Sequence, residues 1–333
     1  MNTINKPKVA VFGGGSWATA IVKMLSENLD EIGWYMRSSY TIEHIKRNRH
    51  NPSYISSVEF NPDQLILTND INKMVDYADY LIFAIPSAFL NKELEKVTTT
   101  FKGKIIFSAI KGIVPETGYI VGEHFFETYQ IPYEDIGVIT GPCHAEEVAL
   151  ERLSYLTIAC RDQEKAQTMA DQLSSRYIKT KTSDDIIGTE YAAVLKNIYA
   201  IAAGIAHGLG YGDNFQAVLM SNAAREMKRF IKKVHKMKRN INNSAYLGDL
   251  LVTGYSVFSR NRMFGNMIGK GYTVKSAMLE MSMVAEGYYA AKSAYKLNQQ
   301  NKANTPIIDT VYNILYNGKD AKSEFKKLAD ILD

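Results

Sequence analysis

Short apolar runs alternate with segments of helical periodicity through the first half of the chain. Residues 9–12, 80–85, 104–108 and 136–140 are largely apolar, which is typical of strands buried on both faces of a parallel sheet. Weaker strand patterns occur at 31–36, 65–68, 155–160 and 177–180, and helical spacing at 16–25, 70–77 and 162–174. This alternation predicts a doubly wound α/β domain with a mostly parallel sheet.

From residue 185 onward the strand patterns disappear and long helical patterns extend to the end of the sequence. We therefore expect two domains, an α/β domain over residues 1–185 and an all-α domain over 186–333. A length of 333 residues allows each of them a core of its own. The segment 191–212 is apolar apart from Lys196, Asn197 and His207, and it contains four glycines. Its central Lys-Asn pair favours a buried core helix over a membrane span.

A glycine-rich turn follows the first strand directly, within the sequence KVAVFGGGSWATA at residues 8–20. Gly13 and Gly15 have the spacing of a dinucleotide-binding motif, and Ala18 takes the third glycine position. Gly13 permits the tight turn, and Gly15 permits a pyrophosphate to approach the backbone closely. The helix that begins near Ser16 presents free N–H groups and a positive dipole end to that anion. Residues 1–185 are therefore predicted to be a Rossmann-like domain that binds NAD or NADP.

Arg37, just after the second predicted strand, bears on the choice between the two cofactors. An acidic residue there commonly binds the ribose hydroxyls of NAD, whereas a basic residue accommodates the 2′-phosphate of NADP. A surface arginine in a loop is the alternative interpretation. The sequence therefore leaves both cofactors open.

Composition narrows the function further. The chain is 46% apolar and 22% charged, as in average globular proteins, and its net charge of +4 suits a small anionic substrate better than a nucleic acid. Two cysteines, Cys143 and Cys160, fit a reducing cytosol. Residues 1–7 lack the apolar core of a signal peptide, so we expect a cytoplasmic protein. The six histidines and two cysteines show no metal-ligand spacing, and the adjacent pair Cys143-His144 is poorly arranged for covalent catalysis.

Lys196 is the most informative single residue. No other charged side chain lies between residues 191 and 205, and apolar residues occupy every face of that predicted helix. A buried ammonium either pairs or loses its proton, and a lysine whose pKa is near neutral suits acid/base work on an alcohol or a carbonyl. A lysine that extends to the helix rim is the alternative.

The segment 247–265 combines a carboxylate, hydroxyls, a guanidinium and an amide, including Asp249, Arg260 and Asn261. Gly248, Gly254 and Gly265 interrupt its helical pattern. Arginine beside asparagine and serine is suitable for binding phosphate, so the segment is a candidate phosphate site. An ordinary solvated loop explains the same composition equally well.

Residues 225–239 form a predicted basic helix with Met227, Phe230, Ile231, Val234 and Met237 on its apolar side. One interpretation is that the basic face of the helix is solvated and its apolar side packs into the core. The alternative is that the basic face is attracted to an anionic membrane surface.

Several motifs in a fixed order are similar to those of one family. They are GGGSWATA near the start, FAIPS at 83–87, IKG around Lys111, TGPCHAEEV at 140–148, VLKNIYAIAAG around Lys196, GDLLVTGYSVFSRNRMFG from Gly248 and MVAEG at 283–287. Together they resemble the bacterial NAD(P)-dependent glycerol-3-phosphate dehydrogenase family from about residue 9 to residue 286. Cys143 stands where the family commonly has serine or threonine, and Ala18 where it commonly has glycine.

The resemblance implies hydride transfer between a nicotinamide and carbon 2 of sn-glycerol 3-phosphate or dihydroxyacetone phosphate, with Lys196 as the acid/base. Lys111 would contact cofactor and substrate, and Asp249 would orient Lys196 or a substrate hydroxyl. Ser259, Arg260 and Asn261 would hold the phosphate. The remaining implied substrate positions are Gly141 and Cys143, and the implied cofactor positions are Gly13, Gly15, Ser16, Trp17, Arg37, Lys111, Ala145, Arg260, Val284 and Glu286.

The resemblance also implies a homodimer and a supply of glycerol 3-phosphate for glycerophospholipid biosynthesis. We expect no nucleic-acid partner and no stable membrane insertion. Two alternatives remain at this point. One is a related two-domain dehydrogenase for another small hydroxy or keto compound, and the other is a non-catalytic NAD(P)-sensing protein.

Overall fold

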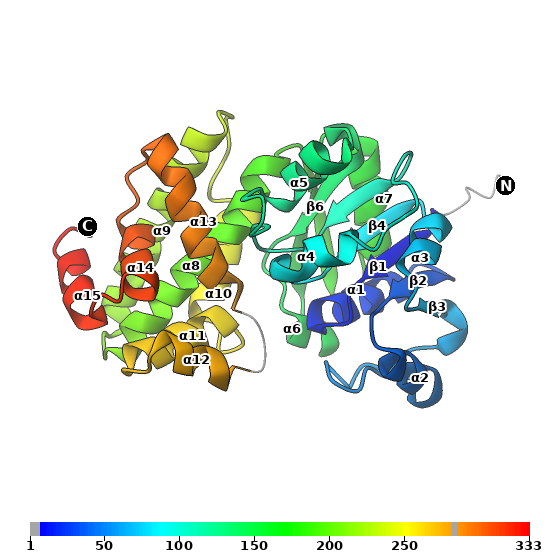
Figure 1. The fold of residues 1–333 in the computed structure, drawn as a ribbon, viewed down its shortest axis with the longest axis horizontal. Coiled ribbons are helices and arrows are strands. Elements are labelled where there is room, and N and C mark those ends of the chain that lie inside the picture. Colours follow the sequence, from blue (N-terminus) through cyan, green and yellow to red (C-terminus); the bar gives the residue numbers. More distant parts are fainter. Residues whose placement is uncertain (1–6, 282–284) are drawn as a thin grey trace. The chain divides into compact units, whose positions relative to one another are not determined.

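The computed structural model of the chain describes residues 7–281 and 285–333. The chain forms two compact units (Figure 1). The first unit consists of Met1–Ile110 and Val121–Ile186, and the second of Lys111–Ile120 and Ile187–Asp333. The segment 111–120 thus leaves the first unit and returns to it, an excursion that has no signal in the hydrophobic pattern.

One eight-stranded sheet forms the framework of the first unit, in the order β3-β2-β1-β4-β5-β6-β7-β8. All neighbouring strands are parallel except β6 and β7. The predicted Rossmann-like sheet is therefore confirmed. The strands are β1 (Val9–Phe12), β2 (Ile32–Tyr35), β3 (Leu65–Thr68), β4 (Tyr80–Phe83), β5 (Ile105–Ser108), β6 (Ile136–Thr140), β7 (Ser154–Cys160) and β8 (Ile178–Ser183).

Helices cover both faces of this sheet, because alternate strand residues pack in opposite directions. Val11 belongs to the aliphatic core shared with α1 and α7, whereas Phe12 stacks on Phe83 with ring centroids 4.6 Å apart, and Phe83 packs against Phe125 of α5. The helices of this unit are α1 (Ser16–Ser26), α2 (Ser39–Asn48), α3 (Ile71–Tyr77), α4 (Ser87–Leu94), α5 (Val121–Tyr129), α6 (Ala145–Ala149) and α7 (Gln163–Leu173), with 3₁₀ turns η1 (Pro62–Gln64) and η2 (Tyr133–Asp135).

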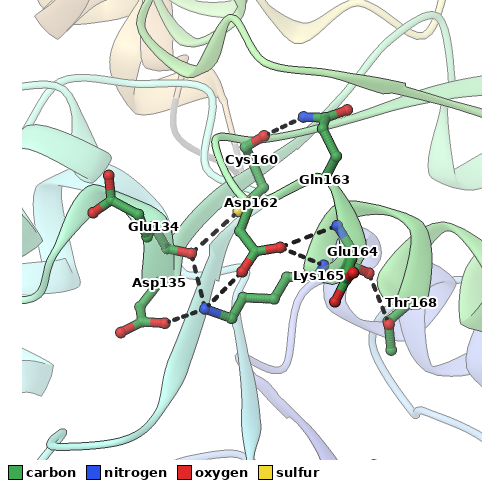
Figure 2. Close-up of polar contacts among 8 residues, drawn as sticks. All are labelled: Glu134, Asp135, Cys160, Asp162, Gln163, Glu164, Lys165 and Thr168. Atoms are coloured by element: carbon green, nitrogen blue, oxygen red, sulfur yellow. Dashed lines mark hydrogen bonds and ion pairs between the residues drawn. The ribbon is translucent and has the colours of Figure 1, made fainter.

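The antiparallel strand β7 brings the start of β6 beside the end of β7, where a polar network joins them (Figure 2). Asp162 caps α7 by accepting hydrogen bonds from the backbone N–H groups of Glu164 and Lys165. Lys165 Nζ lies 2.7 Å from Asp135 Oδ1 and 3.1 Å from Asp162 Oδ2, and it donates to the carbonyl of Glu134. Burial lowers the pKa of Lys165, but the hydrogen bonds and charges of the two carboxylates together raise it above its usual value. One charged side chain therefore ties the entry to β6 to the start of α7.

The second unit is helical, and α8 (Ile186–Gly208) runs through its core, where most of its side chains are fully buried. The predicted core helix is confirmed, and within the described residues no helix meets the length and hydropathy needed to cross a membrane. The other elements are α9 (Asp213–Val234), the π-helical turn η3 (Ser244–Gly248), α10 (Asp249–Tyr255), α11 (Arg260–Gly269), α12 (Val274–Glu280), α13 (Glu286–Asn301), α14 (Pro306–Tyr316) and α15 (Ala321–Ala329).

Two local predictions for this unit were wrong. Gly254 and Gly265 do not interrupt the helical pattern, because each lies inside a helix. Gly265 is required for close packing, since a Cβ there would lie 2.1 Å from the carbonyl oxygen of Ile201. The basic helix ends at Val234 rather than continuing to Arg239, and His235 follows it with an extended backbone.

Candidate active site

The centre of the candidate active site is the buried ammonium of Lys196. Its side chain, on α8, donates hydrogen bonds to Asp249 Oδ1 and, at 3.0 Å, to Thr253 Oγ1 of α10. The residue is only 4% exposed and Asp249 only 1%. The Thr253 hydroxyl in turn donates to the backbone carbonyl of Asp249 at 2.6 Å. The predicted burial of Lys196 is therefore confirmed, and two fixed acceptors hold its Nζ in place.

A second cation lies on the other side of the same carboxylate. Lys111 Nζ is 4.0 Å from Asp249 Oδ2. The backbone of Lys111 is held in turn by the residue after the buried lysine, because Asn197 Nδ2 donates to the Lys111 carbonyl at 2.8 Å. This bond fixes the excursion 111–120 to α8. The structure thus brings together the three charged residues that the sequence singled out in separate motifs.

Burial lowers the pKa of Lys196 to about 7, since an ammonium without water around it favours its neutral form. The negative charge of Asp249 opposes this shift, and the positive charge of Lys111 reinforces it. A side chain that titrates near neutral pH can both give and take a proton under ordinary conditions.

The start of α11 supplies a group of hydrogen-bond donors. Ser259 caps this helix by accepting from the backbone N–H of Arg262, and Arg260 and Asn261 form its first turn. Asn261 is buried, and its Oδ1 accepts from the backbone N–H of Gly287 at 2.9 Å. A helix N-terminus beside a guanidinium is a suitable environment for a phosphate.

Glycines allow the helices that carry these residues to approach closely. A Cβ at Gly204 of α8 would lie 2.1 Å from the carbonyl oxygen of Arg262, and Gly208 of α8 contacts the backbone of Gly269 in α11. Gly287 of α13 would place a Cβ 2.6 Å from the carbonyl oxygen of Asn197. The backbones of α8, α11 and α13 are therefore in direct contact, which fixes Lys196 relative to the first turn of α11.

The glycine turn of the first unit has the geometry that its sequence predicts. Gly13 has φ +136°, and a Cβ there would lie 2.6 Å from the carbonyl oxygen of Ala84. A Cβ at Gly15, by contrast, would meet no protein atom within 4 Å. The turn is thus open to an approaching group beside Gly15, at the N-terminus of α1, which fits the anion-binding role of this motif in a dinucleotide site.

Two buried side chains brace this turn from behind. Trp34 Nε1 donates to the carbonyl of Gly13 at 2.7 Å. Asn51 Nδ2 donates both to the carbonyl of Gly14 at 3.1 Å and to Thr19 Oγ1 at 2.9 Å. Because these bonds use the carbonyl oxygens, they fix the turn without occupying the N–H groups that would face an anion.

The remaining cofactor candidates occupy several elements. Ser16 and Trp17 form the first turn of α1, Ala145 begins α6, and Glu286 begins α13. Val284 lies outside the described residues.

Arg37 follows β2 and is largely exposed, with its Nη1 3.7 Å from the buried Glu93. The remaining substrate candidates in the first unit follow β6. Gly141 has φ +124°, and Cys143 is buried and is not disulfide-bonded to the other cysteine, Cys160.

Sequence reasoning missed four residues of these two sites, which are Thr253, Asn197, Asn51 and Trp34. Thr253 follows Asp249 by four residues, so helical spacing alone places both on one face. Asn197 is the only other polar residue in the middle of the apolar helix. Asn51 and Trp34 had no comparable signal, because their partners are backbone carbonyls of a turn distant in sequence.

A mostly parallel sheet with a glycine turn after its first strand, together with a helical unit that carries a buried lysine, is typical of two-domain nucleotide-dependent dehydrogenases. The chain matches the models of the N-terminal part of NAD-dependent glycerol-3-phosphate dehydrogenase over residues 8–166 and of its C-terminal part over residues 185–326. The chain belongs to this family.

Relatives of known name support this assignment. The chain is 35% identical to glycerol-3-phosphate dehydrogenase [NAD(P)+] of Enterococcus faecalis, over 97% of this chain and 95% of that protein. It is 33% identical to the Bacillus velezensis enzyme of the same name, over 96% of this chain and 93% of that one.

Solved structures agree with the observed fold. The crystal structure of glycerol-3-phosphate dehydrogenase from Coxiella burnetii matches with a TM-score of 0.88 and 25% identity, over 97% of this chain and 99% of that one. D-mandelate dehydrogenase, at 16% identity and a TM-score of 0.61 over 95% of this chain and 99% of that one, shares the fold.

Proposed function

We propose that this chain is an oxidoreductase that interconverts sn-glycerol 3-phosphate and dihydroxyacetone phosphate with NAD or NADP. The observation that carries the proposal is Lys196, which is buried against Asp249 and has a pKa near neutral, in a member of this family. In this proposal the expected domain 1–185 supplies most of the cofactor contacts, and the expected domain 186–333 supplies Lys196 and most of the substrate contacts.

Lys196 is the proposed catalytic acid/base. When bound, the nicotinamide supplies or accepts the hydride at carbon 2 of the substrate. An ammonium has three N–H groups, and Asp249 and Thr253 accept two of them. The third is left for the substrate oxygen. Lys196 therefore gives its proton to the carbonyl during reduction and takes one from the hydroxyl during oxidation.

The substrate phosphate is assigned to Ser259, Arg260 and Asn261, at the start of α11. The support for this assignment is a helix N-terminus with a guanidinium in its first turn. Lys111 adds a positive charge close to Asp249, and Gly141 and Cys143 complete the proposed substrate contacts.

The proposed cofactor contacts centre on the turn with Gly13 and Gly15, followed by Ser16 and Trp17. The open space at Gly15 and the exposed guanidinium of Arg37 support this assignment. The further proposed contacts are Lys111, Ala145, Arg260, Val284 and Glu286.

The test is to compare initial rates of reduction for dihydroxyacetone phosphate and for dihydroxyacetone, with NADH and with NADPH. We expect kcat/KM to fall by roughly three orders of magnitude or more when the phosphate is absent, because a site built for a charged group is then left unpaired. At saturating cofactor, Arg260→Gln should reduce the rate with the phosphorylated substrate much more than it reduces the slow rate with dihydroxyacetone. Equal rates for the two compounds would point to another hydroxy or keto substrate.

The wider role is also a proposal. The product would supply glycerol 3-phosphate for glycerophospholipid biosynthesis in the cytoplasm, so cells depleted of the protein would require added glycerol 3-phosphate to grow. We propose a homodimer, which light scattering of the purified protein would test.

A further inference from the structure

Positive charge is concentrated in one short part of the helical unit. Residues 225–239 contain eight lysines and arginines and one acidic residue, a net charge of +7. The whole chain carries only +4, so the other 318 residues together carry −3. Residues 227–248 contain no aspartate or glutamate at all. We call the lysines of this stretch, Lys228, Lys232, Lys233, Lys236 and Lys238, the basic strip.

Lys228, Lys232 and Lys233 of the basic strip lie on α9, and Lys236 and Lys238 lie on the segment that follows its end at Val234. All five of its lysines are exposed. The inner face of the same helical turns is packed into the core, where Met227, Phe230 and Ile231 are fully buried. The one acidic residue of the stretch, Glu226, is buried as well and accepts hydrogen bonds from the backbone N–H groups of Ile307 and Ile308.

The five lysines are not neutralised locally. In the described part of the chain, no carboxylate lies within 4 Å of any of their ammonium groups, although the neighbouring Arg225 pairs with Asp333. Arg229 and Arg239 donate to the backbone carbonyls of Asn304 and His235. Three of these like charges lie on one face of the end of α9 and the other two on the segment directly after it, an arrangement that costs repulsion energy unless a partner of opposite charge is present.

The chemistry of the strip favours a diffuse anionic surface over a nucleic acid. Single-stranded nucleic acids bind to exposed aromatic side chains on which bases stack. The only phenylalanine of the stretch, Phe230, is buried. Lysine ammonium groups act as point charges without the planar fork that reads individual phosphates. Clusters of four to eight basic residues on a helix are typical of attachment to anionic lipid headgroups.

We propose that the basic strip binds the protein reversibly to the surface of a bilayer that contains anionic phospholipid. The contact is electrostatic and does not insert side chains, because the apolar face of α9 is already used by the core. This membrane binding goes beyond the proposed enzymatic activity and does not depend on it. None of the five lysines belongs to the candidate active site or to the glycine turn described above.

Vesicle co-sedimentation of the full chain tests this proposal. The probes are vesicles of phosphatidylcholine alone and vesicles with about one third phosphatidylglycerol, each at low and at physiological ionic strength. The test variant replaces Lys228, Lys232, Lys233 and Lys236 by glutamine. A matched control makes the same charge change at four other exposed lysines, Lys102, Lys179, Lys181 and Lys319.

We expect the wild type to bind the vesicles that contain phosphatidylglycerol and not those of phosphatidylcholine alone. This binding should weaken as the salt concentration increases. Each lysine near such a surface contributes about 1 kcal/mol, or roughly fivefold in partitioning. The test variant should therefore lose at least about tenfold in its partition coefficient, while the control binds like the wild type and both variants keep their activity. Absence of wild-type binding to anionic vesicles at low salt overturns the proposal. So does an equal loss in the control, or binding to single-stranded DNA that exceeds binding to the vesicles.

Discussion

Among single residues, Lys196 is a charged group in the apolar core of the helical unit. An ammonium in the core is unfavourable unless it is paired, and Asp249 and Thr253 supply the pairing. Asp249 is itself placed between two lysines, of which one is buried and the other, Lys111, is partly exposed. The protonation of Lys196 is thus set by a balance between burial, one negative charge and one positive charge.

This balance makes the pH dependence of activity a test of the site. Reduction requires protonated Lys196, so kcat/KM for dihydroxyacetone phosphate should be highest below about pH 7 and fall above it. Oxidation of glycerol 3-phosphate requires the neutral amine of Lys196, so kcat/KM for that reaction should be low below about pH 7 and rise above it. Asp249→Asn removes the charge that raises the pKa of Lys196 and should move both profiles to lower pH. Lys111→Gln should move them to higher pH, each by about one pH unit.

The opposite directions of these two shifts are the discriminating result. If both variants move the profiles the same way, or not at all, the group that titrates is not Lys196. If Asp249 or Lys111 had a purely structural role, its variant would lower the rate at every pH without moving the pH profile.

Arg37 gives a second prediction for a single residue. Its guanidinium is exposed and positioned beside the buried Glu93. If Arg37 binds the 2′-phosphate of NADPH, Arg37→Ala should raise KM for NADPH by about tenfold or more and KM for NADH by less than about twofold, because one charge-assisted hydrogen bond is lost only with the phosphorylated cofactor. Equal changes for the two cofactors would exclude this role.

At the scale of elements, the helices of the second unit are held together by backbone contacts between α8, α11 and α13. Each contact occurs at a glycine where a side chain has no room, as at Gly204 and Gly287. These contacts set the distance between Lys196 on α8 and the start of α11. They also explain why Gly265, which interrupts the helical pattern in the sequence, lies inside a helix in the structure.

The contact between α8 and α11 can be tested by adding one methyl group. Gly204→Ala would press a Cβ against the backbone of Arg262, so α11 must move or the helices must separate. We expect a loss of about 1–3 kcal/mol in the free energy of unfolding and a raised KM for dihydroxyacetone phosphate. The control is Gly212→Ala, where a Cβ would meet no atom within 4 Å. A fully active and equally stable Gly204→Ala protein would show that the close approach is not needed.

The sequence predicted the elements well and their contacts less well. Buried strands such as β4 and β6 and the core helix α8 follow from hydrophobic periodicity, because burial and periodicity have the same cause. Lys196 was identifiable because an isolated charge in an apolar helix has few explanations. The reversal of β7, the excursion 111–120 and the turn braces Trp34 and Asn51 depend on contacts between distant segments, which leave no local pattern.

At the scale of the whole molecule, the discontinuous second unit is the main organising feature. Ile113 and Ile120 of the excursion are buried in the hydrophobic core of that unit. A single cut in the sequence near residue 186 would therefore leave the helical unit without part of its core and without Lys111.

Ile113→Ala should destabilise the helical unit more than the sheet unit. The two tryptophans, Trp17 and Trp34, both belong to the first unit, so tryptophan fluorescence reports the unfolding of that unit, whereas far-UV circular dichroism follows the helices of both units. We expect a loss of about 2–5 kcal/mol in the circular dichroism transition and a smaller change in fluorescence. Ile331→Ala, at an exposed site, should change neither. A larger shift in fluorescence would place Ile113 in the core of the other unit.

The most direct test of the account is the initial rate of dihydroxyacetone phosphate reduction, measured side by side with NADH and NADPH, for the wild type and for Lys196→Ala. Equilibrium binding of each cofactor is measured on the same samples. We predict turnover by the wild type with at least one cofactor, and a loss of about two to four orders of magnitude in the variant while cofactor binding is retained. A wild type that binds the cofactor and reduces no dihydroxyacetone phosphate, or a variant with a comparable rate, would contradict it.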